Sequence, residues 1–473
     1  MASDIFSFEF KGSSMKMNEK QNPVNYKIVT AHIIAGLIFL TVAITAGLLY
    51  SLQFLNKYPL PGIEFFSPGR VRMLHTNAIA FGWLLNGLLG GMYWAVPRVS
   101  GYSVLSRHLS WLIFWVLQVL VLAAAIGILA GYGQGIEWGE TPIFVDPFIT
   151  LGLILIAINF IPPILRTSRD APLYVSLWYF TGALVWVIMV YIMGNYVPQF
   201  FIPGAAGAAI AGNYIHDLVG LLVTPIGWGL MYFFVPVIIK KPIWSHTMSL
   251  MGFWGLAFFY PMQGIHHFMW SPVPMHVQYS AVVATIAIEV VVTSVLANFI
   301  LTLKGSGDYL RTNYPIRWFY TGMVFYWVTC FQCAIQGTLT VQKLIHFTDW
   351  VVGHSHLVMF GVFSFWLMGI ITELWPRLTG REWYSMSLHS WAYWLNTLGL
   401  VLMFIDLTIA GVVQGFTWWG LNHFMDSVKF SIPFWFIRTL SGLMITAGIL
   451  SLIYNLWMTA RSEKVYEAKI AVA

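Results

Sequence analysis

The chain has 473 residues, of which 58% are hydrophobic and only 9% are charged, and its formal net charge is +6. About a quarter of the residues in a soluble globular domain are charged, so this composition excludes a soluble protein and indicates an integral membrane protein. The basic residues are spread among the loops and form no patch, so the net charge does not indicate nucleic acid and we expect no such partner.

Twelve apolar segments follow one another along the chain, each near the roughly 20 residues that cross a bilayer core. We expect an all-α bundle over residues 28–460, with tails at 1–27 and 461–473 and without a repeat or a soluble domain. The approximate bounds of the segments are 28–52, 70–96, 108–131, 144–165, 173–194, 207–238, 244–268, 277–303, 315–338, 348–375, 388–414 and 432–459.

The distribution of basic residues predicts the orientation of this bundle. The first 21 residues lack the apolar core of a signal peptide, so we expect them in the cytoplasm. With that orientation, 18 of the 24 Lys and Arg residues fall on the inner side, and the outer 131–147 loop carries Glu137, Glu140 and Asp146 but no base. By the positive-inside rule, both ends of the chain are therefore expected in the cytoplasm.

Six of the thirteen histidines fall in one layer near the outer ends of four segments. Polar side chains at such depth are costly and usually functional, and neutral imidazole is the commonest metal ligand. The layer therefore predicts a metal or cofactor site. Its members are His75 in the second segment, His216 in the sixth, His266 and His267 in the seventh, and His354 and His356 in the tenth.

Helix geometry divides these histidines into two groups. His266 and His267 lie about 100° apart on a helix, so both can lean towards one point, and His216 could supply a third nitrogen. Three imidazoles suit copper, zinc or iron and leave a position open for substrate.

The other three histidines predict planar cofactors. His354 and His356 lie about 200° apart and face opposite ways, so one helix could bind two cofactors, and His75 could complete a bis-histidine pair. The alternative to a cofactor-binding protein is a transporter that uses its intramembrane histidines as a proton relay. Such a transporter would show no haem absorption.

The two cysteines, Cys330 and Cys333, form a Cys-Phe-Gln-Cys stretch inside an apolar segment. The next residue is Ala334, so the stretch is not a haem-c attachment motif. We interpret both as plain buried cysteines.

The twelve segments and six histidines resemble the catalytic subunit I of the haem–copper oxidase superfamily over essentially the whole chain. The resemblance implies a twelve-helix bundle that binds two haems and one copper ion, CuB. It implies that His75 and His356 are the axial ligands of a low-spin haem b, that His354 is the proximal ligand of a high-spin haem b3, and that His216, His266 and His267 bind CuB.

Within the superfamily, "HFTDWVVGHSH" (346–356) and "FIRTLSGLMITAGILSLIYNLW" (436–457) resemble the C family, the cbb3-type cytochrome c oxidases. Tyr260, six residues before the histidine pair, matches that family's redox-active tyrosine, which implies His216 as its covalent partner. Tyr260 lies seven positions before His267, so we expect them on one helix face, two turns apart. The resemblance also implies haem-propionate contacts by Arg438, His346 and Asp349 and a proton path through Ser249 and Tyr326.

The chain departs from the C family in two places. Gln332 stands where the family has a glutamate near the proximal histidine, so the haem potential or the proton exit is expected to differ. The stretches "VRMLHTNAIAFGWLLNGLLGGMYWAVP" and "HHFMWSPVP" resemble the related nitric oxide reductases instead.

These features predict a terminal respiratory oxidase of a bacterial inner membrane, embedded in membrane lipid. Electrons from cytochrome c would arrive through cytochrome c-containing subunits of the same complex, O2 would be reduced to water, and protons taken from the cytoplasm would build a gradient. The rival function is reduction of two NO to N2O at a haem and a non-haem iron. The reductases place acids soon after the sixth-segment histidine, where this chain has only Asp217, and they lack a tyrosine at the position of Tyr260.

Overall fold

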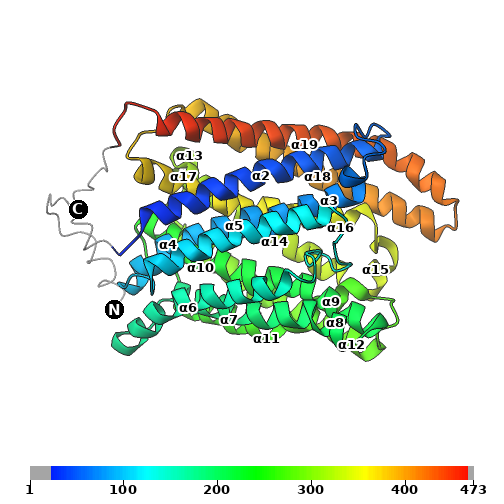
Figure 1. Cartoon of the computed structure of the whole chain (residues 1–473), viewed down its shortest axis with the longest axis horizontal. Coiled ribbons are helices and arrows are strands. Elements are labelled where there is room, and N and C mark those ends of the chain that lie inside the picture. Colours follow the sequence, from blue (N-terminus) through cyan, green and yellow to red (C-terminus); the bar gives the residue numbers. More distant parts are fainter. Residues whose placement is uncertain (1–22, 467–473) are drawn as a thin grey trace.

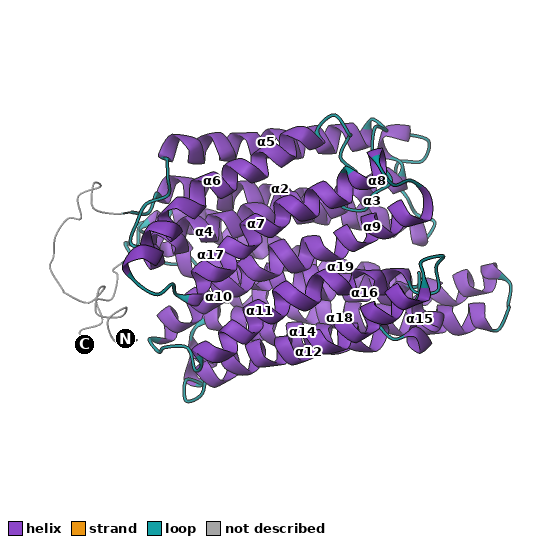
Figure 2. Cartoon of the chain, turned by 90° about the horizontal axis from the view of Figure 1, so that it is seen from below, coloured by secondary structure: helices purple, strands orange, loops and turns teal. Residues whose placement is uncertain are grey.

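The computed structural model describes residues 23–466, and within them the chain is a bundle of helices that run along one common axis (Figures 1 and 2). The only β pairing among these residues is an isolated bridge between Arg381 and Val465. Residues 1–22 and 467–473 lie outside the described part, and so do most of the two tails expected at 1–27 and 461–473.

The helices take up the apolar segments, several of which contain more than one helical piece. Five short pieces with 3-10 or π geometry are labelled η. The elements are α2 (Tyr26–Phe54), η1 (Glu64–Phe66), α3 (Pro68–Asn77), η2 (Ala78–Leu84), α4 (Leu85–Ser100), α5 (Arg107–Leu129), α6 (Asp146–Asp170), α7 (Val175–Asn195), α8 (Val197–Phe200), α9 (Gly204–Leu218), η3 (Val219–Val223), α10 (Thr224–Ile239), α11 (His246–Gln263), η4 (Gly264–Phe268), α12 (Met275–Thr302), α13 (Asp308–Thr312), α14 (Tyr314–Gln336), α15 (Leu339–Ile345), α16 (Asp349–His356), η5 (Leu357–Ser364), α17 (Phe365–Thr379), α18 (Met386–Trp419) and α19 (Phe424–Ala460).

By length and apolarity, ten helices of the described chain can cross a membrane, or up to eleven if α14 and α15, bent by 99°, form one span. Twelve spans are therefore not confirmed by this measure. The remaining expected segment, 244–268, corresponds to α11, which ends at Gln263 where the chain tightens into the 3-10 turn η4.

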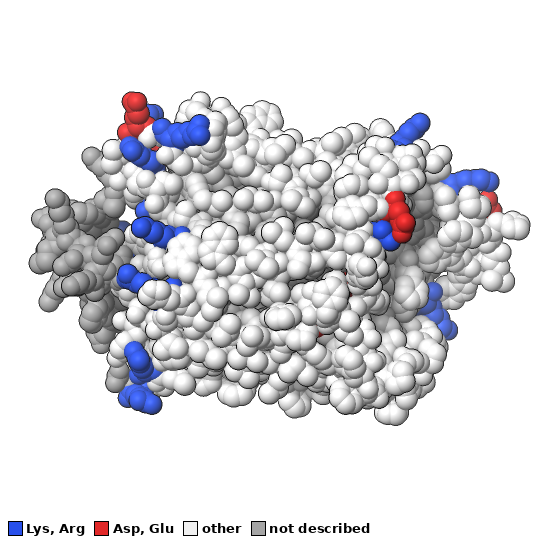
Figure 3. Space-filling model, in the orientation of Figure 1, with Lys and Arg blue, Asp and Glu red and all other residues white. Residues whose placement is uncertain are grey.

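The surface of the bundle matches a lipid environment. Trp115, Ile126 and Phe258 each expose more than 60% of their area, as expected for side chains that face lipid rather than water. Figure 3 shows Lys and Arg at the two ends of the visible face, with an uncharged band between them. The start of α2 and the end of α19 lie at the same end (Figure 1).

Three histidine-bearing segments change from α to π geometry just after their histidines. His75 is followed by η2, His216 by η3, and His356 by η5. A π turn holds one extra residue in the helix and is concentrated at functional sites. Each histidine therefore sits where its helix is locally widened, towards the end of the bundle that carries α3, α9 and α16 in Figure 1.

The loop between α5 and α6 closes over this end and carries a buried acid. Glu140 is 2% exposed, and its Oε2 accepts a hydrogen bond of 2.8 Å from Nδ2 of Asn77. Burial raises the pKa of the Glu140 carboxyl to about 7.

We expect Glu140→Gln to remove a pH dependence of stability. The folded chain holds this proton more tightly than the unfolded chain, so stability is full below about pH 4.5 and is lost as the pH rises to about 7. The difference corresponds to about 3 kcal/mol. Apparent Tm in detergent, measured between about pH 5 and about pH 8, should fall less in the variant than in the parent protein. Glu137→Gln, at an exposed neighbour, should keep the parent slope, and equal slopes in all three proteins would contradict the expectation.

Candidate metal centre

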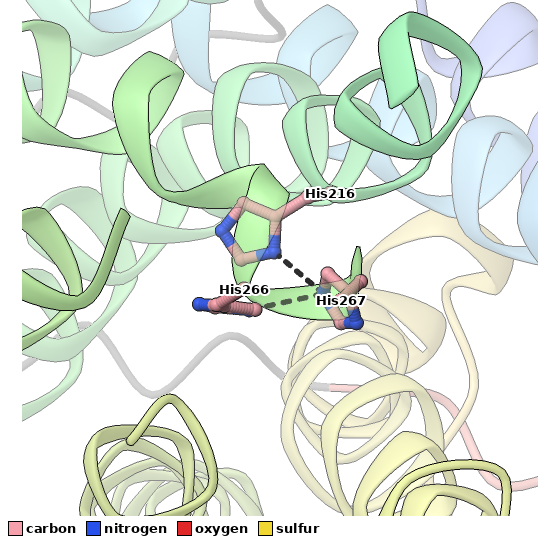
Figure 4. Close-up of side chains that lie close together, drawn as sticks. All are labelled: His216, His266 and His267. Carbon is pink, nitrogen blue, oxygen red and sulfur yellow. Dashed lines mark hydrogen bonds between the residues drawn. The ribbon is translucent and has the colours of Figure 1, made fainter. Parts of the chain in front are cut away.

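Three histidine nitrogens converge between α9, η4 and α12 (Figure 4). Nδ1 of His216 lies 3.0 Å from Nε2 of His267, and Nε2 of His266 lies 3.1 Å from the same atom. One ligand atom from each of the three lies within 4.8 Å of the others, and this is the one such group found among residues 23–466. The structure therefore brings the three predicted copper ligands together.

The hydrogen bonds of His266 fix the nitrogen that it offers. The Thr285 hydroxyl of α12 donates to the carbonyl of Ala281, so it accepts, at 2.8 Å, from Nδ1–H of His266. Nε2 of His266 is then left with a lone pair that points at the other two imidazoles. The three imidazole nitrogens lie close enough together to share one cation as their partner, so the donor set fits a metal ion.

The donor set is made of imidazole alone. Asp217, next to His216 in the chain, accepts a hydrogen bond of 2.9 Å at Oδ2 from Nδ2 of Asn213 and does not belong to the group of convergent ligand atoms. Imidazoles suit copper, zinc and iron, whereas non-haem iron sites commonly add a carboxylate. The composition of this trio fits copper or zinc better than non-haem iron.

We expect Thr285→Val to weaken metal binding by about 10–100-fold, because the groups that orient ligating histidines have effects of this size. Metal content after dialysis against a chelator measures the effect. Thr302→Val removes a hydroxyl from the other end of α12, where it accepts from the Trp244 amide, and should leave metal content unchanged. Equal retention of metal in both variants would show that Thr285 does not orient the ligand.

Tyr260 lies in the last turn of α11, with its ring stacked on His216 at a centroid distance of 4.4 Å and an interplanar angle of 17°. The Tyr260 ring packs directly against Gly220 of η3, where a Cβ atom would overlap it. Nε2 of His216 is buried and has no hydrogen-bond partner. The expected continuous helix from Tyr260 to His267 is wrong, because α11 ends at Gln263.

His354 lies across a cavity from the trio. Nδ1 of His354 lies 2.8 Å from the side-chain oxygen of Gln332, which can only accept, so this nitrogen carries the proton and Nε2 is free to bind a metal. The cavity has an empty volume of about 800 Å³ and is also lined by the trio and by Tyr260. It can hold a planar cofactor between the His354 side and the trio.

His75 and His356 form a second pair. Their ring centroids are 6.2 Å apart with an interplanar angle of 23°, too far for direct ring contact. Nδ1 of His75 donates to the carbonyl of Ala43 at 2.7 Å, and Nδ1 of His356 donates to that of Val352 at 2.8 Å. Two metal–nitrogen bonds of about 2 Å, added to the radii of the two rings, account for this separation, so the pair fits an intervening metal.

Two of the three predicted propionate contacts lie near one another. Asp349 accepts hydrogen bonds of 2.6 Å from Gln414 and 2.8 Å from Trp435, and the buried Arg438 lies within electrostatic range of Asp349. His346 lies instead against the backbone of η4, at the trio.

The two predicted proton-path residues lie in different surroundings. Tyr326 of α14 lines the cavity and packs against Trp228 and Trp366. Ser249 of α11 is fully buried, donates to the carbonyl of His246 at 2.6 Å and does not line the cavity.

Two residues of the site were not predicted from the sequence. Thr285 orients His266, and its spacing carried no signal. Glu289 lines the cavity one helical turn after Thr285, and an acid inside the apolar segment 277–303 was a signal that could have identified it.

Comparison with known proteins agrees with this geometry. The family described as "Cytochrome C and Quinol oxidase polypeptide I" matches residues 27–444. The cbb3-type cytochrome c oxidase subunit CcoN1 of Stutzerimonas stutzeri is 28% identical over 470 residues, covering 95% of this chain and 98% of the relative. A nitric oxide reductase component of the same organism is 23% identical over 488 residues, covering 94% of this chain and 97% of that relative.

The fold has a solved counterpart in a haem–copper terminal oxidase dimer studied by cryo-EM, with a TM-score of 0.78, 14% identity, and coverage of 94% of this chain and 85% of that one. The family match confirms the predicted resemblance and excludes the transporter alternative. The chain therefore belongs to the cytochrome c and quinol oxidase polypeptide I family.

Proposed function

We propose that this chain is the oxygen-reducing subunit of a cbb3-like terminal oxidase. One observation carries the proposal: an all-imidazole trio that faces His354 across a cavity, with Tyr260 stacked on one of its members. The trio would hold CuB, His354 would hold a high-spin haem b3, and His75 with His356 would hold a low-spin haem b. When bound, these groups would deliver electrons to O2 in the cavity.

In this proposal, Tyr260 supplies an electron and a proton that the haem and the copper do not. Breaking the O–O bond takes four electrons and a proton, and a phenol can give one of each. The unpartnered Nε2 of His216 beside the Tyr260 ring supports a covalent bond between the two side chains. Such a bond would hold the phenol next to the copper. Forming it would break one ring C–H bond and the imidazole N–H bond, with the two protons released and the two electrons taken up by O2, the proposed substrate.

Gln332 would tune the high-spin haem. We expect Gln332→Glu to lower its midpoint potential by about 60 mV, because a charge-assisted hydrogen bond is roughly twice as strong as a neutral one and about 1.4 kcal/mol equals about 59 mV for one electron. Spectroelectrochemical titration measures the shift. Gln336→Glu, one turn away where Gln336 accepts from Trp350, should leave the potential unchanged, and a shift of equal size there would contradict the role of Gln332.

The twelve-helix topology is part of the proposal. If α11 with η4 and the bent pair α14–α15 each cross the bilayer, the count rises to twelve, an even number, and the two described ends lie on one side as Figure 1 has them. We place those ends in the cytoplasm of a bacterial inner membrane, with a membrane domain over residues 28–460. Protons would enter past Ser249 and Tyr326, and cytochrome c-containing subunits would deliver electrons at the outer face.

Nitric oxide reduction is the second candidate, because Glu289 places a carboxylate in the same cavity and a nitric oxide reductase is among the relatives. Metal analysis and gas consumption on one purified preparation separate the two. The oxidase requires one copper per two b haems and rapid O2 consumption. Iron in place of copper, with NO consumption alone, would refute the oxidase proposal.

A further inference from the structure

Glu289 of α12 is a half-buried acid whose carboxylate has no partner among the described residues. Both of its carboxylate oxygens are inaccessible and make no hydrogen bond with any described residue. The residue lines the cavity between the copper trio and His354, yet neither haem nor copper binding uses it.

Other orphaned polar atoms share the wall of this cavity. The hydroxyl of Thr329 on α14 and the side-chain oxygen of Gln263 at the end of α11 are also buried without partners. Buried water occupies sites that are large enough and that offer two to four polar partners, and this wall offers both. Water next to Glu289 would satisfy its oxygens and connect them to the cavity.

The surroundings of the two carboxylate oxygens favour the neutral form of Glu289. A carboxylate in a low-dielectric interior costs several kcal/mol unless a cation pairs with it, and no cationic side chain among the described residues bonds to these oxygens. The neutral acid is therefore its resting form. Intramembrane acids that are kept despite this cost mark ion and proton pathways.

Glu289 also interacts with a residue of the predicted proton path and lies one helical turn from a residue that orients a metal ligand. It is within electrostatic range of Tyr326 and of Cys330, which follows Tyr326 by one helical turn, and the Tyr326 hydroxyl bonds to Thr224. On its other side, Thr285 precedes Glu289 by four residues on α12 and orients His266.

We propose that Glu289 is a proton-carrying carboxyl group of the cavity, which releases its proton through cavity water to the substrate chamber and regains one from the Tyr326 side. The step moves a proton only: the carboxyl O–H bond breaks, a water oxygen receives the proton, and the carboxylate is reprotonated without electron transfer. The inference rests on the proposed oxidase function and names a proton carrier for it.

The test compares Glu289→Gln and Glu289→Asp with Glu373→Gln, which alters an acid of α17 that is paired with Arg377 and lies outside the cavity. In reduced-minus-oxidised infrared spectra, the band of a protonated carboxyl group should be present in the parent and in E373Q and absent in E289Q. Proton uptake in a single turnover, followed with a pH dye, should slow by about 100-fold in E289Q, as expected for loss of a proton-transfer group. E289D should recover most of this rate, and copper and haem contents should stay at parent levels in all variants.

Several results would overturn the inference. One is an unchanged carboxyl band or an unchanged rate of proton uptake in E289Q. Another is a rate of proton uptake that falls as much in E373Q as in E289Q. Loss of the metal in E289Q would do so too, because it would make Glu289 a ligand instead. These outcomes leave the oxidase proposal standing if the parent protein contains copper and reduces O2. If the parent protein lacks copper or does not reduce O2, the proposed function is refuted. The carboxyl band would still report whether Glu289 holds a proton.

Discussion

Tyr260→Phe is expected to abolish O2 reduction while both haems and the copper stay bound. The Tyr260 ring stacks on His216 at 4.4 Å, and its packing against Gly220 leaves room for phenylalanine, which has the same ring. The phenol hydroxyl is lost, and with it the proposed source of a proton and an electron and the proposed bond to His216. Removing a group that acts at the reacting centre typically costs several orders of magnitude, so we expect a fall of about 10³-fold or more.

The measurement is O2 consumption with an artificial electron donor, alongside haem spectra and copper analysis. Tyr93→Phe is the matched control, since the Tyr93 ring is buried and its hydroxyl accepts from Asn159 away from the cavity. It should keep parent activity. Appreciable O2 reduction by Y260F would remove Tyr260 from the mechanism.

His266→Ala is expected to remove the copper and with it all O2 reduction. His266 supplies one of three converging nitrogens, and His216 and His267 alone leave the ion with two protein ligands. Affinity should fall by more than the roughly 100-fold that loss of a ligand-orienting group costs. The spectrum of the low-spin haem should not change, because His75 and His356 are on other helices.

Copper per haem, measured by elemental analysis, checks this expectation. His32→Ala is the control: His32 is fully buried and bonds to Asn86 at 3.0 Å, away from the trio, so its loss should not affect copper. Full copper occupancy in H266A would mean that the trio is not the copper site.

Much of the site could be predicted from the sequence because it depends on spacing within helices. His354 and His356 are two positions apart in the chain, and helical geometry turns their side chains to opposite sides. In the structure His354 faces the cavity and His356 faces His75. The bounds of the apolar segments indicated how deep each histidine lies in the membrane. That depth alone was enough to predict that the six histidines share one layer.

What could not be predicted depends on departures from α geometry. The seventh segment is largely apolar up to Gln263, and although Pro261 and Gly264 signal a break in the helix, they do not specify the 3-10 turn that carries His266 and His267. That turn forms through contacts with α9 and α12, which are distant in sequence. Propensity is a weak guide where tertiary packing decides the backbone.

The π segments have a consequence for comparing this chain with its relatives. A π turn is equivalent to one residue inserted into an α-helix, and one residue corresponds to about 100° of rotation. A helical wheel drawn through η2, η3 or η5 at constant pitch therefore assigns every later position of that helix to the wrong side. Where a relative lacks the extra residue, an alignment shows a single gap within a membrane segment, and that gap marks a rotated helix rather than a missing loop.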